Sequence, residues 1–410
     1  MKNPMKKVSS KSSIVFVFFL ILIFSLKFLL FVFNNIAIAK KLKILKFGTS
    51  TDLSGSNSFL GKEMSSGIKL AFEKINREGG INGHQLKLIV LDDSYEPEKT
   101  LKNMLKLINT YKVLGIVGNV GTPTGVVAME VAIKNRILFF APLTGANALR
   151  PKPPSPYVYH YRASYYEELD VLLSNFLKCK KLTPLDIAFF TQNDAYGDEI
   201  YDAGIDILKK FGLKDEGKIL HLRYPRNTLY VYSAAAKFLR IKPHPKAIVL
   251  GCSYNACIRF IKVLREYNYN GYFLGVSFVG TDALGKKAKE KPEIYKNILV
   301  ANVTPLPTDS SYPIVKEYLQ ELKKVNKNPS FVSLEGYIVG KILIEALKNT
   351  KGVFTRKSIV KAFSNLGTFD IGLNTPLKFE KYTHQASHFV LVVTFKNGKI
   401  LPVNWKRCEF

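Results

Sequence analysis

The chain has 410 residues, which is more than one ordinary hydrophobic core accommodates, so about two domains are expected. Its hydrophobic content of 47% excludes an intrinsically disordered chain. The formal net charge is +28, but the lysines are scattered between predicted elements and form no long basic run, so no nucleic-acid partner is expected.

The first 39 residues have the pattern of an export signal. Four lysines precede an apolar run from Ile14 to Leu26, and Ala37-Ile38-Ala39 is the small-x-small sequence that signal peptidase cuts. We predict cleavage after Ala39. The stretch from Ile14 to Phe33 has 20 residues, enough to span a bilayer, so an uncleaved membrane anchor is the alternative. In either case residues 40–410 are expected outside the cytoplasm.

The next stretch predicts a strand–helix–strand unit. A short strand is expected at Ile44–Phe47, a helix face at Leu60–Ile75 and a second strand at Leu86–Leu91. The loop Thr49–Ser58, which contains Ser54, follows the first strand and is rich in hydroxyl groups. Ligands of such units lie beyond the carboxyl ends of the strands, so this loop is a candidate binding loop.

Two later loops have the same character. Gly121-Thr122 follows a strand expected at Val113–Val117, and Thr144-Gly145 follows one expected at Ile137–Ala141. Hydroxyls and backbone N–H groups from neighbouring loops are able to converge on one small anionic or polar group. The alternative is that each loop is an ordinary helix cap or tight turn.

A proline-rich segment, residues 150–156, predicts the exit from a first α/β domain. The alternation of strands and helices then resumes, with strands expected at Asp186–Phe190, Lys218–Leu222, Ala247–Leu250 and Tyr272–Val276. Two parallel-sheet domains of similar pattern favour a protein of two lobes with a cleft between them.

Motifs for bond-making chemistry are missing from the sequence. It has no G-x-S-x-G elbow and no G-x-G-x-x-G fingerprint, so neither an enzyme nor a cofactor is expected. His384 and His388 are four residues apart, but the context does not favour a helix, and no metal site is expected. Asp92-Asp93 is interpreted as a pair of solvated caps, with a pair of interacting carboxylates as the alternative. Four cysteines are too few for a disulfide scaffold, and whether Cys252 and Cys257 are bonded stays open.

Several of these stretches together resemble one family. The run LSGSNSFLGKEMSSGIKLAFEKINREGGINGHQLKLIVLDDSYEP is similar to the N-terminal signature of type I periplasmic solute-binding proteins, and more narrowly of the branched-chain amino-acid (Leu/Ile/Val) binding proteins of ABC importers. GNVGTPTGVVA, APLTGANALR, YRASYYEE, QNDAYGDE and GVSFVGTDAL continue the resemblance in the same order, over residues 43–400.

The resemblance implies an α/β fold of two doubly wound parallel-sheet lobes, joined by three hinge crossings near 161–164, 301–305 and 382–387. Lobe 1 is expected to contain residues 40–162 and 303–383, and lobe 2 residues 163–302 and 384–410. The implied protein is periplasmic and not catalytic. It captures an amino acid or a related carboxylate in the cleft and delivers it to a membrane permease. A membrane-anchored sensor of the same fold is the alternative.

The resemblance also implies the binding residues. The ligand carboxylate is expected at Thr122, with Thr144 and Gly145 contributing from the next loop, and Tyr196 is expected to lie against the ligand. The full expected set is Ser54, Leu60, Gly121, Thr122, Thr144, Gly145, Tyr196, Tyr254 and Ser277.

The sequence departs from the family at two places. Ser277 stands where the Leu/Ile/Val-binding proteins have an acidic residue that pairs with the ligand ammonium, and burying an ammonium without a carboxylate is costly. Either another acid replaces it, with Asp194 and Asp282 nearest in the motifs, or the ligand is not an ordinary α-amino acid. The family's N-lobe disulfide is also absent, since Tyr95 and Gly121 occupy its positions.

Overall fold

The computed structural model describes residues 25, 27 and 43–410, of which residues 44–410 form one compact unit. The predicted signal sequence, its cleavage after Ala39 and the alternative anchor fall on residues 1–39, which lie outside the described part of the chain except for Ser25 and Lys27. Within the described residues, no helix has both the length and the apolar character needed to cross a bilayer.

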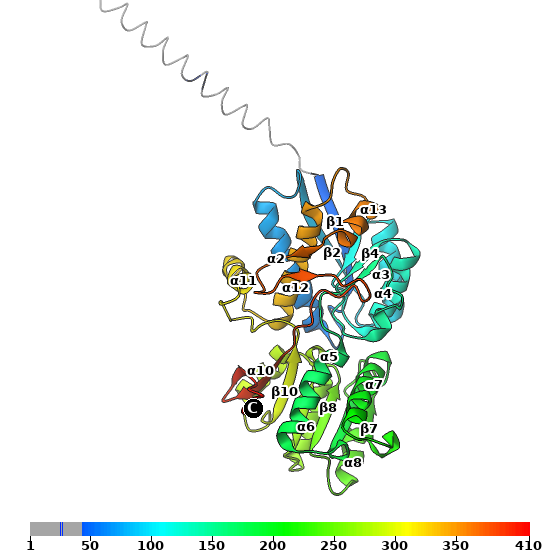
Figure 1. Cartoon of the computed structure of the whole chain (residues 1–410), viewed down its shortest axis with the longest axis vertical. Coiled ribbons are helices and arrows are strands. Elements are labelled where there is room, and N and C mark those ends of the chain that lie inside the picture. The colour runs from blue at the N-terminus through cyan, green and yellow to red at the C-terminus, as the bar shows by residue number, and fades with distance from the viewer. Residues whose placement is uncertain (1–24, 26, 28–42) are drawn as a thin grey trace, which may run out of the picture. The chain divides into compact units, whose positions relative to one another are not determined.

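The first sheet has five strands in the order β2-β1-β3-β4-β5. Their bounds are β1 (Lys43–Thr51), β2 (His84–Asp92), β3 (Gly115–Val117), β4 (Leu138–Phe140) and β5 (Val158–Tyr159). β1 pairs with β3, β3 with β4, and β4 with β5, all in parallel. Helices connect successive strands: α2 (Ser58–Arg77), α3 (Pro97–Asn109) and α4 (Thr122–Lys134). We call this sheet and the helices that pack with it the first lobe (Figure 1).

Three late helices pack on the first lobe, namely α11 (Pro313–Lys324), α12 (Phe331–Lys348) and α13 (Arg356–Ser364). Glycines explain how closely α12 approaches α2. A Cβ on Gly67 of α2 would overlap the Ser333 carbonyl of α12, and one on Gly336 of α12 would overlap the Met64 carbonyl of α2. The absence of side chains at these two positions therefore lets the two helix backbones touch. A short pair, β11 (Thr368–Phe369) and β12 (Leu377–Lys378), follows α13.

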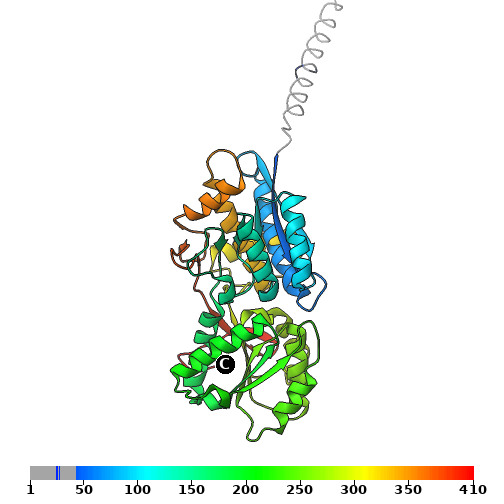
Figure 2. The same ribbon diagram turned by 90° about the vertical axis from the view of Figure 1, so that its right-hand side faces the viewer.

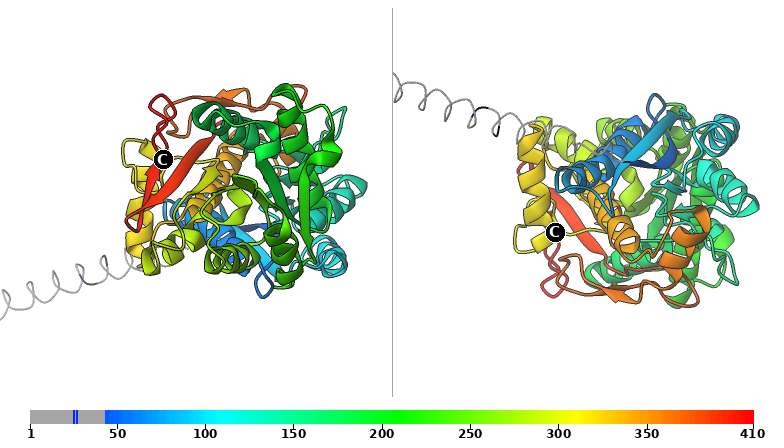
Figure 3. Two further views of the ribbon diagram at one scale, coloured as in Figure 1. Left: turned by 90° about the horizontal axis from the view of Figure 1, so that it is seen from below. Right: turned by 90° about the horizontal axis from the view of Figure 1, so that it is seen from above.

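The second sheet has seven strands in the order β14-β13-β10-β9-β8-β6-β7. Its parallel part consists of β6 (Ile187–Gln192), β7 (Leu220–Tyr224), β8 (Ala247–Gly251), β9 (Tyr272–Gly275) and β10 (Ile298–Asn302). β13 (Leu391–Lys396) and β14 (Lys399–Pro402) extend it antiparallel. β13 lies beside β10 in the view from below (Figure 3).

Helices lie on both faces of the second sheet (Figure 2). They are α5 (Tyr165–Leu169), α6 (Asn175–Lys180), α7 (Ala195–Lys210), α8 (Tyr232–Arg240), α9 (Tyr254–Glu266) and α10 (Thr281–Glu290). A π-helical segment, Asp170–Ser174, joins α5 to α6. Disulfides join Cys252 to Cys257 and Cys179 to Cys408, and the second of these ties the C-terminus to α6. We call this sheet and its helices the second lobe.

The three chain segments between the lobes lie together, as the predicted hinge crossings require. The His160 N–H donates to the His384 carbonyl at 2.8 Å, and the Ser387 N–H donates to the Tyr161 carbonyl at 2.9 Å. The Tyr161 hydroxyl donates to the Val303 carbonyl at 3.2 Å. The architecture confirms the predicted fold class. The predicted bounds of the lobes stay a prediction, since residues 44–410 form a single compact unit.

Candidate binding site between the lobes

Two threonine hydroxyls meet at the carboxyl ends of β3 and β4. Thr122 Oγ1 and Thr144 Oγ1 are 2.7 Å apart, and both side chains are fully buried. Thr122 is the first residue of α4, which has no side-chain cap at its N-terminus. The Thr144 loop is fixed to the second lobe's first helix, because the Tyr165 N–H donates to the Gly145 carbonyl at 2.9 Å. A Cβ on Gly145 would lie 2.5 Å from that Tyr165 nitrogen, so only glycine fits here.

Gly121 allows an aromatic ring to lie against this threonine pair. Its φ of 98° with ψ of 157° belongs to a region that only glycine populates freely. A Cβ at Gly121 would overlap the ring of Tyr95. The two positions that lack the family's disulfide therefore contact each other, and a tyrosine ring occupies the space. The Tyr95 hydroxyl accepts a hydrogen bond from Gln192 Nε2 of the second lobe at 3.2 Å.

Aromatic side chains of the second lobe face these groups. The rings of Tyr165 and Tyr196 are 5.6 Å apart between centroids, and the ring of Phe278 is 4.8 Å from that of Tyr196 and 6.2 Å from that of Tyr95. Tyr165 and Tyr196 are fully buried, and the Tyr196 hydroxyl has no hydrogen-bond partner among the described residues. Buried tyrosine hydroxyls normally find a partner, so this group is available to a ligand.

A buried ionic cluster adjoins the tyrosines. Arg162 donates to both carboxylate oxygens of Glu335, from Nε at 2.9 Å and from Nη2 at 2.8 Å. Its remaining nitrogen, Nη1, is 3.9 Å from Glu168 Oε1 and has no hydrogen-bond partner in the part of the chain that the structure describes. Glu168 accepts hydrogen bonds from the N–H of Ser277 at 2.7 Å and from its hydroxyl at 2.9 Å.

Burial changes the acidity of Glu168. Its side chain is fully inaccessible, and loss of solvation raises its pKa to about 7, although Arg162 and the two Ser277 hydrogen bonds act in the opposite direction. The two acids that the sequence motifs suggested as replacements for Ser277 are engaged elsewhere. Asp194 caps α7 by accepting from the N–H groups of Tyr196 and Gly197, and Asp282 accepts from the Phe331 N–H.

The rims of the lobes touch at several polar and aromatic contacts. Arg226 of the second lobe donates to Glu96 Oε2 at 2.9 Å, and Ser56 Oγ donates to Asn227 Oδ1 at 2.7 Å. The rings of Phe59 and Tyr254 meet edge to face, 6.2 Å apart between centroids. These contacts enclose the buried groups, so the structure has the two lobes closed on each other.

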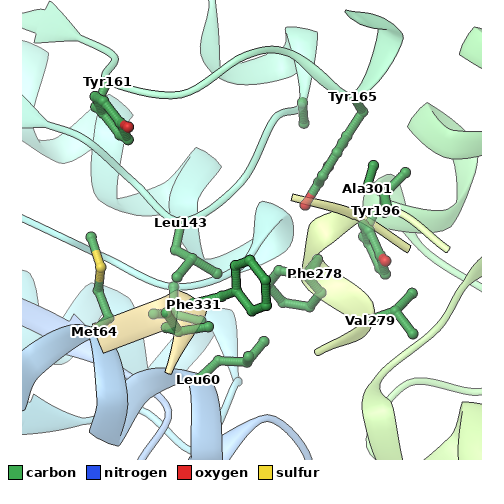
Figure 4. Close-up of a cluster of buried hydrophobic side chains, with 14 of the residues drawn as sticks. Leu60, Met64, Leu143, Tyr161, Tyr165, Tyr196, Phe278, Val279, Ala301 and Phe331 are labelled. Carbon is green, nitrogen blue, oxygen red and sulfur yellow. The ribbon is translucent and has the colours of Figure 1, made fainter. Parts of the chain in front are cut away.

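A continuous apolar cluster fills the space between the lobes (Figure 4). The first lobe contributes Leu60, Met64, Leu143 and Phe331, and the second lobe and hinge contribute Tyr165, Tyr196, Phe278, Val279 and Ala301. The few polar groups described above therefore lie beside apolar and aromatic side chains.

The structure brings most of the predicted residues together. Gly121, Thr122, Thr144 and Gly145 form one group, Tyr196 faces it, and Leu60 and Ser277 are buried nearby, whereas Tyr254 lies on the rim. Ser54 differs, because its side chain is exposed and donates to Asp92 Oδ2 at 2.6 Å. The prediction of solvated caps is wrong for Asp93. The Asp93 side chain is fully buried, and it accepts hydrogen bonds from the hydroxyls of Ser50 and Thr100. Burial raises the pKa of Asp93 to about 6.

Sequence reasoning did not find Arg162, Tyr165, Glu168, Phe278 and Glu335. The first three lie in the run YRASYYEE, and Phe278 in GVSFVGTDAL, so the family motifs contained them but gave them no role. The signal that was available is a cluster of charged and aromatic residues directly after the first hinge crossing. Glu335 lies in α12, far from Arg162 along the chain, and only the fold places the two residues side by side.

Comparison with known proteins shows the family to which this chain belongs. The periplasmic binding protein family matches residues 44–399, so the chain belongs to that family. The family comprises solute-binding proteins rather than enzymes, and its members work outside the cytoplasm. The expected fold and the resemblance to Leu/Ile/Val-binding proteins are thereby confirmed.

Particular relatives agree with this class. A solved structure of a possible leucine/isoleucine/valine-binding protein from Rhodopirellula baltica SH 1 is 40% identical, with a TM-score of 0.85 over 90% of this chain and 98% of that one. Leu/Ile/Val-binding protein homolog 7 of Brucella abortus (strain 2308) is 24% identical, over 88% of this chain and 91% of its own. A solute-binding protein of an ABC transporter from R. palustris, solved with benzoate, is 18% identical, with a TM-score of 0.76 over 88% of this chain and 96% of that one.

Proposed function

We propose that this chain is the extracytoplasmic solute-binding component of an ABC importer. It holds a small carboxylate-bearing ligand, an amino acid or a related compound, between its lobes and delivers it to a membrane permease. The observation that carries this proposal is the pair of buried hydroxyls of Thr122, which begins α4, and Thr144, which lies in the loop after β4. No charged side chain is needed there, because the helix N-terminus favours an anion.

The threonine pair suits a carboxylate chemically. Each hydroxyl has one hydrogen to donate, and in the present arrangement one of the two is used within the pair. A carboxylate placed between them accepts from both, and the first-turn N–H groups of α4 supply further donors. This geometry supports the predicted ligand-binding roles of Thr122 and Thr144.

The rest of the ligand lies against the apolar cluster. Leu60 and Phe278 come from opposite lobes, and Tyr196 offers an aromatic face with a free hydroxyl. An aliphatic or aromatic side group buries its surface there, at about 25 cal/mol for each Å² removed from water. The ligands in the names of the relatives above fit this chemistry, because benzoate, leucine, isoleucine and valine each have a carboxylate beside an apolar group.

A ligand screen tests the proposal. The mature chain is mixed with amino acids, aliphatic acids, aromatic acids and short amides, and its thermal unfolding midpoint is recorded. We expect carboxylates to raise the midpoint, and Thr122→Val to remove the increase. The matched control is Thr308→Val, an exposed threonine, which should respond as the wild type does. The proposal is contradicted if only the amides raise the unfolding midpoint, or if carboxylates raise the midpoint of Thr122→Val as much as that of the wild type.

Export belongs to the same proposal. We expect the protein to be periplasmic after removal of residues 1–39, so N-terminal sequencing of the exported protein should begin at Lys40. An N-terminus at Met1 would instead support the membrane-anchored sensor.

A further inference from the structure

A cavity of about 530 Å³ opens on the first lobe, beside the last of the three chain segments that join the lobes. Its walls come from β5, from the end of α13, from β12 and from the segment that follows β12. None of the residues predicted to bind the interlobe ligand lines this cavity. Its volume is within the usual range for small-molecule pockets, so the cavity is large enough for a ligand of its own.

Aromatic rings form the wall of this cavity. Tyr159 of β5 stacks on His384, with the ring centroids 4.4 Å apart and the planes 3° from parallel. Phe379 meets the ring of Tyr159 edge to face at 5.1 Å, and Phe363 lies 5.2 Å from it. Tyr382 also lines the cavity and is 75% exposed. Aromatic groups pack by stacking and by edge-to-face contact, so a planar ring is the shape that suits this wall.

The hydroxyl of Tyr159 is an unused hydrogen-bonding group on this wall. The Tyr159 side chain is only 2% exposed, and its hydroxyl bonds to no residue of 43–410. The hydroxyl oxygen is not fully enclosed by protein atoms, so a partner reaches it from the cavity that Tyr159 lines. Burial raises the pKa of Tyr159 to about 12, so the group is a neutral donor at pH 7. Buried hydroxyls normally have a partner, and a ligand in the cavity would supply it.

The free charge at the cavity is positive. Lys378 and Lys381 line it, and neither ammonium group has an ion-pair partner in the described part of the chain. Glu380, the acid between them, is already engaged. Its Oε1 bonds to His388 Nε2 at 2.8 Å, and its Oε2 accepts from the Thr383 hydroxyl at 2.8 Å. An anion placed here would therefore find two free ammonium groups as donors.

We propose that this cavity is a second ligand site, separate from the one between the lobes, and that it takes a planar aromatic carboxylate. The ring lies against the wall formed by Tyr159, Phe363 and Phe379. The carboxylate lies toward Lys378 and Lys381, and a polar substituent on the ring accepts a hydrogen bond from the Tyr159 hydroxyl. This site shares no residue with the interlobe site, so it does not depend on the function proposed above.

Titration calorimetry at pH 7.5 with three matched compounds tests this site. 4-Hydroxybenzoate has the planar ring, the anion and the polar substituent. 4-Hydroxybenzamide lacks the anion, and trans-4-hydroxycyclohexanecarboxylate lacks the planar ring. The titrations use the wild type and Thr122→Val, in which the interlobe site is expected to be impaired. We expect 4-hydroxybenzoate to bind both proteins, and the other two compounds to bind Thr122→Val at least about tenfold more weakly.

Substitutions in the cavity, each added to Thr122→Val, locate the binding. Lys378→Gln combined with Lys381→Gln should weaken the binding of 4-hydroxybenzoate at least about tenfold, because both charge-assisted contacts are lost. Tyr159→Phe removes a single hydrogen bond and should weaken it about fivefold. Both lysines are exposed, and unliganded unfolding midpoints show that each variant is folded.

The matched control is Lys286→Gln combined with Lys289→Gln. These two lysines of α10 are also exposed and also three residues apart, but they lie in the second lobe. The double substitution lowers the net charge by the same amount, so it should leave the binding of 4-hydroxybenzoate unchanged. Equal weakening in the two double variants would mean that net charge, rather than the cavity, governs binding, and would overturn the proposal.

The remaining outcomes separate the two sites. If Thr122→Val binds none of the compounds, or if the cavity substitutions leave its binding unchanged, the second site is overturned and the function proposed above is unaffected. Equal binding of the amide or of the non-planar acid also overturns it. If the cavity substitutions abolish binding while Thr122→Val alone responds to every carboxylate as the wild type does, the second site is supported and the function proposed above fails.

Discussion

Ser277 donates both its backbone N–H and its hydroxyl to the carboxylate of Glu168, which lies 109 residues earlier in the chain. A serine therefore stands where the related Leu/Ile/Val-binding proteins are expected to have an acid, and a carboxylate from another helix is bonded directly to it. These two hydrogen bonds join α5 to the loop after β9.

The backbone at Gly121 gives a first prediction. Gly121→Ala should destabilise the protein by about 3–5 kcal/mol, because the substitution combines backbone strain with overlap of the Tyr95 ring. Urea unfolding measures the loss. Gly352→Ala is a matched control, since Gly352 also has a positive φ, of 76°, but a Cβ there meets nothing within 4 Å. It should cost about 1–2 kcal/mol. Equal losses would show that Tyr95 does not pack as described.

Three buried carboxylates contribute stability that is lost as pH rises. Burial raises the pKa of Asp93 to about 6 and those of Glu168 and Asp282 to about 7. Between pH 4 and these values the folded state binds more protons than the unfolded state, so stability falls as pH increases through this window. Burial lowers the pKa of His160 and His221, which acts in the opposite direction, so the test compares the wild type with Asp93→Asn at pH 5.5 and pH 8. Asp93→Asn should lose less stability than the wild type between these two pH values, and an equal loss in both would contradict the assignment.

The disulfide between Cys179 and Cys408 predicts a stabilised C-terminus. It closes a loop across a sequence separation of 229 residues, and the C-terminal Phe410 packs near Phe176 and Lys180. Cys408→Ala should cost about 2–4 kcal/mol under oxidising conditions, as measured by urea unfolding. In excess reductant the variant and the wild type should unfold at similar denaturant concentrations. A difference that persists in reductant would mean that packing, rather than the disulfide, is responsible.

The contact between Arg226 and Glu96 joins the lobes and predicts an effect on ligand release. Arg226→Ala should raise the dissociation rate of a bound ligand about threefold to fivefold, because it weakens the closed state more than the open one. Stopped-flow displacement measures this rate. Lys209→Ala removes the exposed pair with Glu216, which lies within the second lobe, and should leave the rate unchanged. Equal dissociation rates in the two variants would show that the contact between Arg226 and Glu96 does not slow ligand release.

The sequence predicted the elements and their order well, because hydrophobic periodicity and loop residues report local structure. It placed Thr122 and Thr144 at neighbouring strand ends, and they do meet. It did not predict the partnership of Glu168 with Ser277 or of Arg162 with Glu335, since both depend on how distant elements pack. Nor did it predict the bond between Cys179 and Cys408, because spacing along the chain says nothing about a separation of 229 residues.

The same limit applies to Asp93 and Ser54. Both are small polar residues in or beside loops, where exposure is the usual outcome. Asp93 is buried, and hydrogen bonds from Ser50 on the adjacent strand and Thr100 on α3 replace its contacts with water. Ser54 turns outward to Asp92 instead of toward the threonine pair. Which way such a side chain points is decided by its neighbours in the fold.

The most direct test of the central claim is a crystal structure of the mature chain with the tightest-binding carboxylate from the ligand screen. The account predicts density for the ligand between the lobes, with its carboxylate within hydrogen-bonding distance of Thr122 Oγ1 and Thr144 Oγ1. A ligand bound elsewhere, or one whose carboxylate contacts neither threonine, would contradict it.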